Sequence, residues 1–113
     1  MATHEGWSNY ETWAVKLWID NEEPSHRHWC DAADQALRDG PQSIAGTSIM
    51  REPSDLLAER LESELEESMP ELEGVWADLL RAAFGDVDWH EIAESMLGNA
   101  RERAGTDAAG EAT

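Results

Sequence analysis

Residues 8–21, SNYETWAVKLWIDN, constrain the fold more than any other stretch, because they combine a helix start signal with an apolar helical face. Ser8 and Glu11 have the S-x-x-E spacing of a capping box, which predicts that a helix starts there. The apolar residues that recur at helical spacing are Tyr10, Trp13, Ala14, Leu17 and Trp18. Because aromatic side chains bury the most area, we expect Trp13 and Trp18 to be core residues.

Two further helices are predicted in the first two thirds of the chain. Residues 25–38 have a thin apolar face that includes Trp29, and the helix is expected to end at Gly40. Residues 55–68 follow Ser54, an N-cap candidate, and repeat an apolar residue every fourth position. The repeating residues are Leu57, Leu61, Leu65 and Met69.

The last two predicted helices lie on either side of Gly85. Residues 71–84 have the cleanest apolar stripe of the chain, made of Leu72, Val75, Trp76, Leu79, Leu80 and Ala83. Residues 89–101 follow a second capping box formed by Asp88 and Glu91. The side chains expected to face inward from this last helix are Trp89, Ile92, Ala93, Met96, Leu97 and Ala100.

The remaining segments lack a helical period. Residues 42–53 are expected to form an irregular loop, because a single short strand has nothing to pair with. Past Arg103 the residues are small and polar, which predicts a disordered tail over residues 104–113. The sequence therefore predicts an all-α protein: one domain over residues 1–103, folded as a compact bundle of four to five amphipathic helices.

The charge of the chain restricts its partners. With 8 Lys and Arg against 25 Asp and Glu, the formal net charge is −17 over 113 residues. Direct binding to nucleic acid or to an anionic membrane needs cationic contacts, so we expect neither, and a basic protein is the favoured partner. A single cysteine, no signal peptide and no apolar run of membrane-spanning length together predict a cytoplasmic protein.

We find no credible catalytic or metal site in the sequence, and we expect no cofactor. His26 and Cys30 share a helical face at i, i+4, whereas His28 points elsewhere. The paired ligand spacings of closed zinc sites are absent. Nothing in the sequence orients a histidine as a base for Cys30, so a buried structural cysteine is the better interpretation.

The acidic residues from the third predicted helix onward carry the functional signal. From residue 62 to residue 80 there are seven acids and no basic residue. Like charges at i, i+4 cost helix stability, yet Glu62 and Glu66 stack in this way. Carboxylates one helical turn apart have a spacing of the same order as DNA phosphates. The candidate partner-binding acids are Glu59, Glu62, Glu64, Glu66, Glu67, Glu71 and Glu73.

Five of the six tryptophans lie on predicted apolar faces and are expected in the core, namely Trp13, Trp18, Trp29, Trp76 and Trp89. Trp7 is the one outside these faces, just before the first helix start. Two interpretations remain open at this point. Its ring packs over the beginning of the helix, or it is exposed as a further partner-binding residue.

Residues 8–22, SNYETWAVKLWIDNE, and residues 86–97, DVDWHEIAESML, resemble a family of small acidic proteins of uncharacterised function. That family occurs in phages, plasmids and other mobile elements. The likeness covers about residues 7 to 100, although the family usually has Asn at the position of Ala14. The resemblance implies an accessory protein of a mobile element without catalytic residues. Acidic proteins of such elements include anti-restriction and anti-CRISPR inhibitors that resemble DNA. Extending that role to this chain is an argument by analogy.

Two functional hypotheses follow. The first is a DNA-mimic inhibitor of a host defence system, whose acidic surface occupies the basic groove of a restriction or CRISPR effector. The alternative is a non-catalytic adaptor whose acid serves only solubility, with Trp7 and residues 42–53 as its partner surface. An enzyme ranks last. The oligomeric state stays open, a homodimer included.

Overall fold

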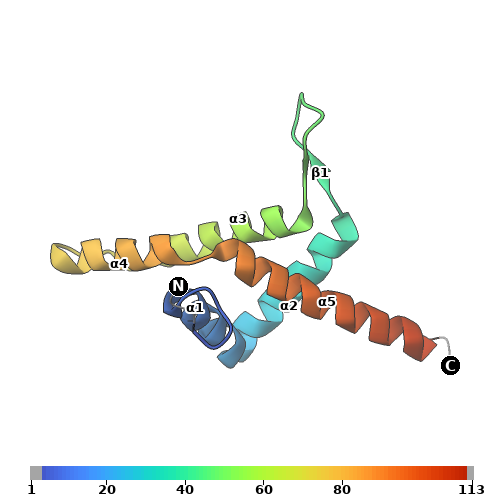
Figure 1. Cartoon of the computed structure of the whole chain (residues 1–113), viewed down its shortest axis with the longest axis horizontal. Helices are drawn as coiled ribbons and strands as arrows, with labels where there is room; N and C mark the ends of the chain where they lie inside the picture. The colour runs from blue at the N-terminus through green and yellow to red at the C-terminus, as the bar shows by residue number, and fades with distance from the viewer. Residues whose placement is uncertain (1–3, 112–113) are drawn as a thin grey trace.

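The computed structural model describes residues 4–111, and the side chains among them as far as residue 105. It is mostly helical, which confirms the predicted all-α class, and one small hairpin interrupts the helices (Figure 1). In chain order the elements are α1 (Tyr10–Asn21), α2 (Glu23–Asp39), β1 (Gln42–Ser43), β2 (Met50–Arg51), α3 (Pro53–Glu67), α4 (Val75–Asp86) and α5 (Trp89–Glu111).

Helix α5 is the centre of the fold, because α2 and α3 both pack along it. Figure 1 shows α2 crossing α5, with α3 beside them. The core of these three helices consists of Trp29, Ala32 and Ala33 from α2, Leu57 and Leu61 from α3, and Trp89, Ile92, Ala93, Met96, Leu97 and Ala100 from α5. The inward faces predicted for the second, third and fifth helices are therefore confirmed.

Helix α1 meets this core with the side nearly opposite to the predicted one. Its buried residues are Thr12, Lys16 and Ile19. Trp18 is 67% exposed, and Tyr10 is also exposed. The prediction that Trp18 is a core residue is therefore wrong, and Trp13 is only half-buried.

Polar contacts at the beginning of α1 explain its orientation. The Thr12 hydroxyl donates a hydrogen bond to Asn9 Oδ1 (2.6 Å) and accepts one from the Asp88 N–H (2.8 Å). Asn9 Oδ1 also accepts from the Thr12 N–H at 2.9 Å, so Asn9 is the N-cap. The prediction of Ser8 as the first capping residue is wrong by one position, and both residue types are good caps.

Helices α2 and α3 each have proline in the first turn, where no hydrogen-bonded N–H is needed. These prolines are Pro24 in α2 and Pro53 in α3. The beginning of α3 differs, because its N-cap is Glu52 instead of the predicted Ser54. The Glu52 N–H donates to the Asp55 carboxylate at 3.2 Å, which is the half of a capping box in which the N3 side chain accepts from the N-cap backbone.

Helix α4 begins later than predicted and is not a core helix. Its N-cap is Gly74, whose φ of +63° suits glycine, and it continues through Gly85 to Asp86. None of its 12 residues, all of them described, is buried. Trp76 is 66% exposed, so the predicted core role of this apolar stripe is wrong. Five of the six stripe residues are exposed and Leu80 is half-buried; the exposed ones are Leu72, Val75, Trp76, Leu79 and Ala83.

Residues 42–53 hold a short antiparallel hairpin where a loop was predicted. Gln42 pairs with Arg51 and Ser43 pairs with Met50. The expectation failed because both strands come from the same segment, so each supplies the partner of the other. Positions 41–50 are exposed throughout, which is why no apolar alternation indicates the strands.

The molecule is elongated, at 58 × 39 × 31 Å with a radius of gyration of 16.2 Å. A compact domain of this length has a radius of about 13 Å. Figure 1 shows α4 and the end of α3 projecting on one side, and α5 on the other. Helix α5 runs to Glu111, past the predicted end at 101, and residues 112 and 113 of the predicted tail lie outside the described residues. Within 4–111 no helix has the length and apolarity of a membrane span.

Candidate partner-binding surface

Two of the candidate acids form ion pairs, with basic side chains from β2, from α2 and from α3 itself. Glu59 forms an ion pair with Arg51 of β2, and this hydrogen bond raises the pKa of Arg51. The Glu64 carboxylate accepts hydrogen bonds from Arg60 Nε (2.6 Å) and His28 Nε2 (2.9 Å). Partial burial is the largest influence on the pKa of Glu64 and raises it, but these two partners together bring the pKa below its ordinary value. Both acids therefore also stabilise the fold.

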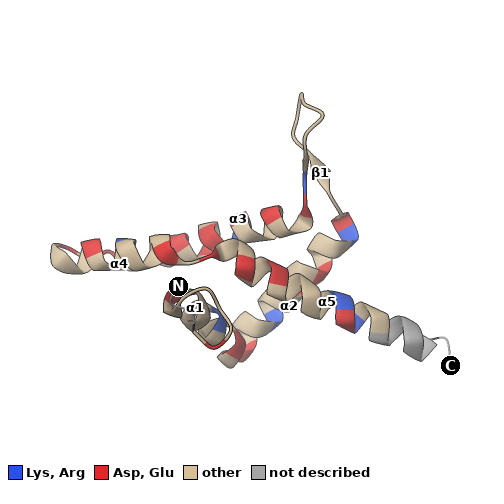
Figure 2. Cartoon of the chain, viewed as in Figure 1, with Lys and Arg blue, Asp and Glu red and all other residues tan. Residues whose placement is uncertain are grey.

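The other five candidate acids lie where α3 ends and the chain turns toward α4. All five side chains are exposed, and within the described part of the chain none of them forms an ion pair. They are Glu62, Glu66, Glu67, Glu71 and Glu73. Figure 2 shows this end of the molecule to be mainly acidic, whereas Lys and Arg lie mostly on other elements. The structure thus separates the candidate acids into a compensated pair and an uncompensated group.

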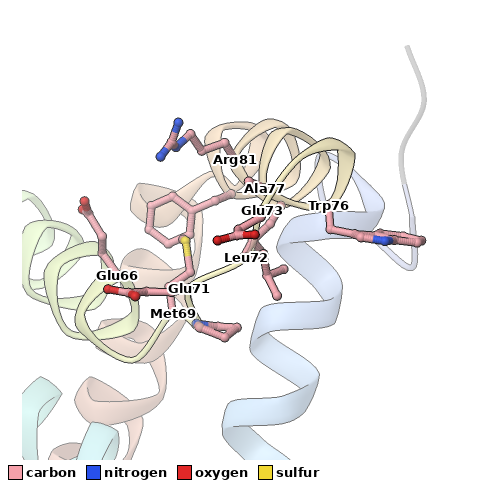
Figure 3. Close-up of a pocket in the computed structure, with 11 residues that line it drawn as sticks. Glu66, Met69, Glu71, Leu72, Glu73, Trp76, Ala77 and Arg81 are labelled. Atoms are coloured by element: carbon pink, nitrogen blue, oxygen red, sulfur yellow. The ribbon is translucent and has the colours of Figure 1, made fainter.

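Three of the uncompensated acids border a groove of about 1000 Å³, which we call the acidic groove. It lies between the end of α3, the segment 68–74 and α4. Its acids are Glu66, Glu71 and Glu73, its basic residue is Arg81, and its main apolar residues are Met69, Leu72, Trp76, Leu80 and Phe84. Figure 3 shows Glu66 and Trp76 on opposite sides of this groove, with Arg81 extending on the Glu66 side. The groove therefore offers apolar area and negative charge together.

A second groove, of about 390 Å³, lies on the other side of α4, against α1. Its lining is mostly apolar and includes the exposed Trp18 together with Leu65. Met69, Leu80 and Phe84 line both grooves. Helix α4 is consequently bordered by open space on two sides, and Leu80 and Phe84 are half-buried between them.

The two stretches 8–22 and 86–97 meet in the structure, at a place that we call the motif junction. Besides the Thr12–Asp88 bond, the Ser8 N–H donates to Glu91 Oε1 (3.1 Å). The Asn9 side-chain amide donates to the Asp86 carbonyl (2.6 Å). The Glu91 N–H donates to Asp88 Oδ1 (3.0 Å), which is one half of the predicted capping box. The Glu91 carboxylate accepts from Ser8 and not from the Asp88 N–H, so the other half of the predicted capping box is not formed. The two motif stretches therefore stabilise the contact between α1 and α5.

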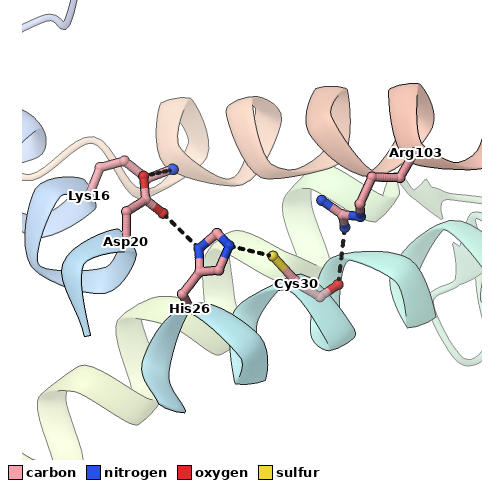
Figure 4. Close-up of polar contacts among 5 residues, drawn as sticks. All are labelled: Lys16, Asp20, His26, Cys30 and Arg103. Carbon is pink, nitrogen blue, oxygen red and sulfur yellow. Dashed lines mark hydrogen bonds and ion pairs between the residues drawn. The ribbon is translucent and has the colours of Figure 1, made fainter. Parts of the chain in front are cut away.

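A polar network joins α1, α2 and α5 (Figure 4), and α5 takes part through Arg103, whose side chain donates to the Cys30 carbonyl at 3.4 Å. Lys16 Nζ, on a buried side chain, lies 2.5 Å from Asp20 Oδ2. The other Asp20 oxygen lies 3.3 Å from His26 Nδ1, and His26 Nε2 lies 3.5 Å from Cys30 Sγ. His26 and Cys30 do share a face, whereas His28 turns to Glu64. Among the described residues, no three His, Cys, Asp or Glu side chains are arranged to hold a metal ion.

Trp7 is half-buried and packs against the core cluster. Its backbone pairs with that of His4 through two hydrogen bonds of 2.8 and 2.9 Å. Of the two interpretations left open by the sequence, this arrangement favours packing over the beginning of α1. Two tryptophans that the sequence assigned to the core, Trp18 and Trp76, are exposed. The sequence held no signal for this, because a helical stripe is equally apolar whether or not another element covers it.

The chain belongs to DUF7249, a family of unknown function, whose match covers residues 1–106. It matches no curated protein and no solved structure.

Proposed function

We propose that this member of DUF7249 is a non-catalytic inhibitor that binds a basic nucleic-acid-binding protein in place of DNA. The observation that supports this proposal is the group of exposed carboxylates at the α3–α4 end, which have no ion-pair partner among the described residues. Such a group costs self-repulsion in the free protein, and a cationic groove relieves this repulsion on binding.

The arrangement of the acids along α3 also supports mimicry. Glu62 and Glu66 lie one helical turn apart, which is about 6 Å at a rise of roughly 1.5 Å per residue. Both are exposed and lie outside the stripe of Leu57 and Leu61 that faces the core. A partner can therefore approach this row of charges without disturbing the core, and attraction between opposite charges speeds its association.

The proposed target is a restriction or CRISPR effector, and the proposed origin is a phage, plasmid or other mobile element. The support for both is the resemblance of the two motif stretches to proteins of such elements. Effectors of this kind hold nucleic acid in positively charged channels, which suits a protein with a net charge of −17.

The test is capture from a lysate of bacteria that carry restriction and CRISPR systems, with elution by duplex DNA or by salt. A test variant replaces Glu62, Glu66, Glu67 and Glu71 by Gln, which removes four charges and keeps side-chain size. A matched control variant removes four exposed charges elsewhere, through Glu22→Gln, Asp31→Asn, Asp86→Asn and Glu102→Gln. Both variants are first checked for wild-type helicity by circular dichroism.

We expect the wild type and the control variant to retain nucleic-acid-binding proteins that DNA elutes. We expect the test variant to lose at least nine tenths of them. Equal capture by the test variant, or captured proteins that DNA does not release, would refute mimicry.

The adaptor hypothesis has an observation of its own, in the exposed apolar side chains of the hairpin. Ile44, Ile49 and Met50 are exposed there. If the double variant Ile49→Ser, Met50→Ser abolishes capture and the Gln variant does not, the adaptor function is the better account.

A further inference from the structure

Helix α4 has an apolar stripe that the fold leaves uncovered. It is amphipathic, yet Val75, Trp76 and Leu79 are all more than half exposed. A helix of this kind normally buries its apolar face against another element. Large exposed apolar patches with polar borders mark interaction sites in soluble proteins. The stripe therefore needs an occupant from outside the described fold.

The chemistry of the acidic groove indicates which kind of occupant fits. Its lining combines apolar side chains such as Leu72 and Trp76 with the acids Glu66, Glu71 and Glu73. None of these three acids has an ion-pair partner among the residues described. A complementary ligand thus needs an apolar side that fills the groove and cationic side chains that reach its border.

We infer that the acidic groove binds an amphipathic helix of a partner protein, with an apolar side against α4 and Lys or Arg along its edges. A helix of this pattern lays its apolar face into a groove through residues at i, i+3, i+4 and i+7. Helix α4 has 12 residues, which is about 18 Å, so about three turns of partner helix match it. The inference rests on the proposed function in one respect, namely that the partner is cationic. It adds that the partner must also present an apolar helical side to the groove.

A second copy of this chain is the less suitable occupant. Each copy has a net charge of −17, and pairing through this face sets the acids of one border against those of the other. Uncompensated like charges at close distance oppose association. Charge complementarity therefore selects a basic helix over a homodimer.

The test uses two synthetic peptides of 14 residues with the same Leu and Lys content. In the first, leucines occupy i, i+3, i+4 and i+7 positions, and in the second they are distributed around the helix. Binding of the labelled peptides is followed by fluorescence anisotropy at low and high salt. We expect the amphipathic peptide to bind at least tenfold more tightly than the scrambled peptide.

Two variants of the protein separate the apolar and the ionic contributions. Trp76→Ala with Leu79→Ala removes exposed apolar area and favours helix, so α4 should persist while the affinity for the amphipathic peptide falls at least tenfold. Glu71→Gln with Glu73→Gln should weaken binding and reduce its salt dependence. A matched apolar control on the exposed side of α1, Tyr10→Ala with Leu17→Ala, should bind like wild type.

The outcomes distinguish this inference from the proposed function. Equal binding of both peptides, or wild-type binding by the Trp76→Ala, Leu79→Ala variant, refutes the groove and leaves DNA mimicry to be judged by the lysate capture. Expected peptide binding together with unchanged lysate capture by the fourfold Gln variant refutes mimicry and leaves the groove. If the wild type sediments as a dimer and the Trp76→Ala, Leu79→Ala variant as a monomer, the occupant is a second copy of the chain. That result overturns the inference.

Discussion

The motif junction and the acidic groove differ in whether their polar side chains have partners within the fold. At the junction Ser8, Asn9 and Thr12 make hydrogen bonds to residues more than 70 positions away, over a buried core. At the groove Glu71 and Trp76 are exposed, and no described side chain forms an ion pair with the acid. The most recognisable sequence motifs thus hold the fold together, whereas the surface with unmet contacts is the candidate for binding.

The largest expected difference between the two regions is in the free energy of unfolding when one aliphatic side chain in each is replaced by alanine. Ile92 beside the junction is fully buried, so Ile92→Ala should lower the free energy of unfolding by about 2–5 kcal/mol. Leu79 on α4 is 54% exposed, so Leu79→Ala should change it by about 0.5 kcal/mol or less. Urea denaturation of both variants measures this difference. Equal losses would show that α4 is covered in solution, which contradicts an open groove.

A smaller effect should follow from removing one hydroxyl at the junction. Thr12→Val keeps the shape of the side chain but leaves the Asp88 N–H without its acceptor, at a cost of about 1–3 kcal/mol. Thr12→Ser is the matched control, because it keeps the hydroxyl and loses only a methyl group. Thermal melting that ranks the serine variant no higher than the valine variant would mean that this bond does not orient α1.

The smallest effect concerns Glu64, one of the two compensated acids of α3. The pKa of Glu64 in the folded protein lies below its ordinary value of 4.5. Its stabilising contribution is therefore complete above that value, and is lost as the pH falls through the lower pKa of the folded state. Because the pair is partly exposed, the contribution should be only a few tenths of a kcal/mol.

The measurement for Glu64 compares Glu64→Gln with wild type between pH 7 and pH 3. We expect the difference in unfolding free energy to shrink on acidification. Glu67→Gln is the control, because that side chain is exposed and has no described ion-pair partner. A difference for Glu64→Gln that is independent of pH would show that His28 and Arg60 do not stabilise the carboxylate.

Periodicity in the sequence was sufficient for α2, α3 and α5. The stripes containing Trp29, Leu57 and Ile92 are buried, because each of these helices has one apolar side and a neighbour that covers it. Capping signals placed the beginning of α5 at Asp88. They missed the beginning of α1 by one position, because Ser8 and Asn9 are nearly equivalent as caps. They missed the beginning of α3 by two positions, where Glu52 and Asp55 form the capping box instead.

The faces of α1 and α4 depended on the tertiary structure. A helical period shows that one side is apolar, but it does not show whether another element covers that side. In α1 the bond between Thr12 and the Asp88 N–H turns the polar side inward and leaves Trp18 outside. In α4 the stripe is apolar and still open, because the chain after Met69 projects away from the core.

The acids show the same division between sequence and structure. The sequence by itself determined that the chain is strongly acidic, and that no basic residue stands among the seven acids between positions 62 and 80. The tertiary structure decided which acids are neutralised. Folding brings Arg51 to Glu59, and His28 to Glu64 from 36 positions away. Charge is a property of composition, whereas its compensation depends on distances across the fold, and these arise only when the helices pack.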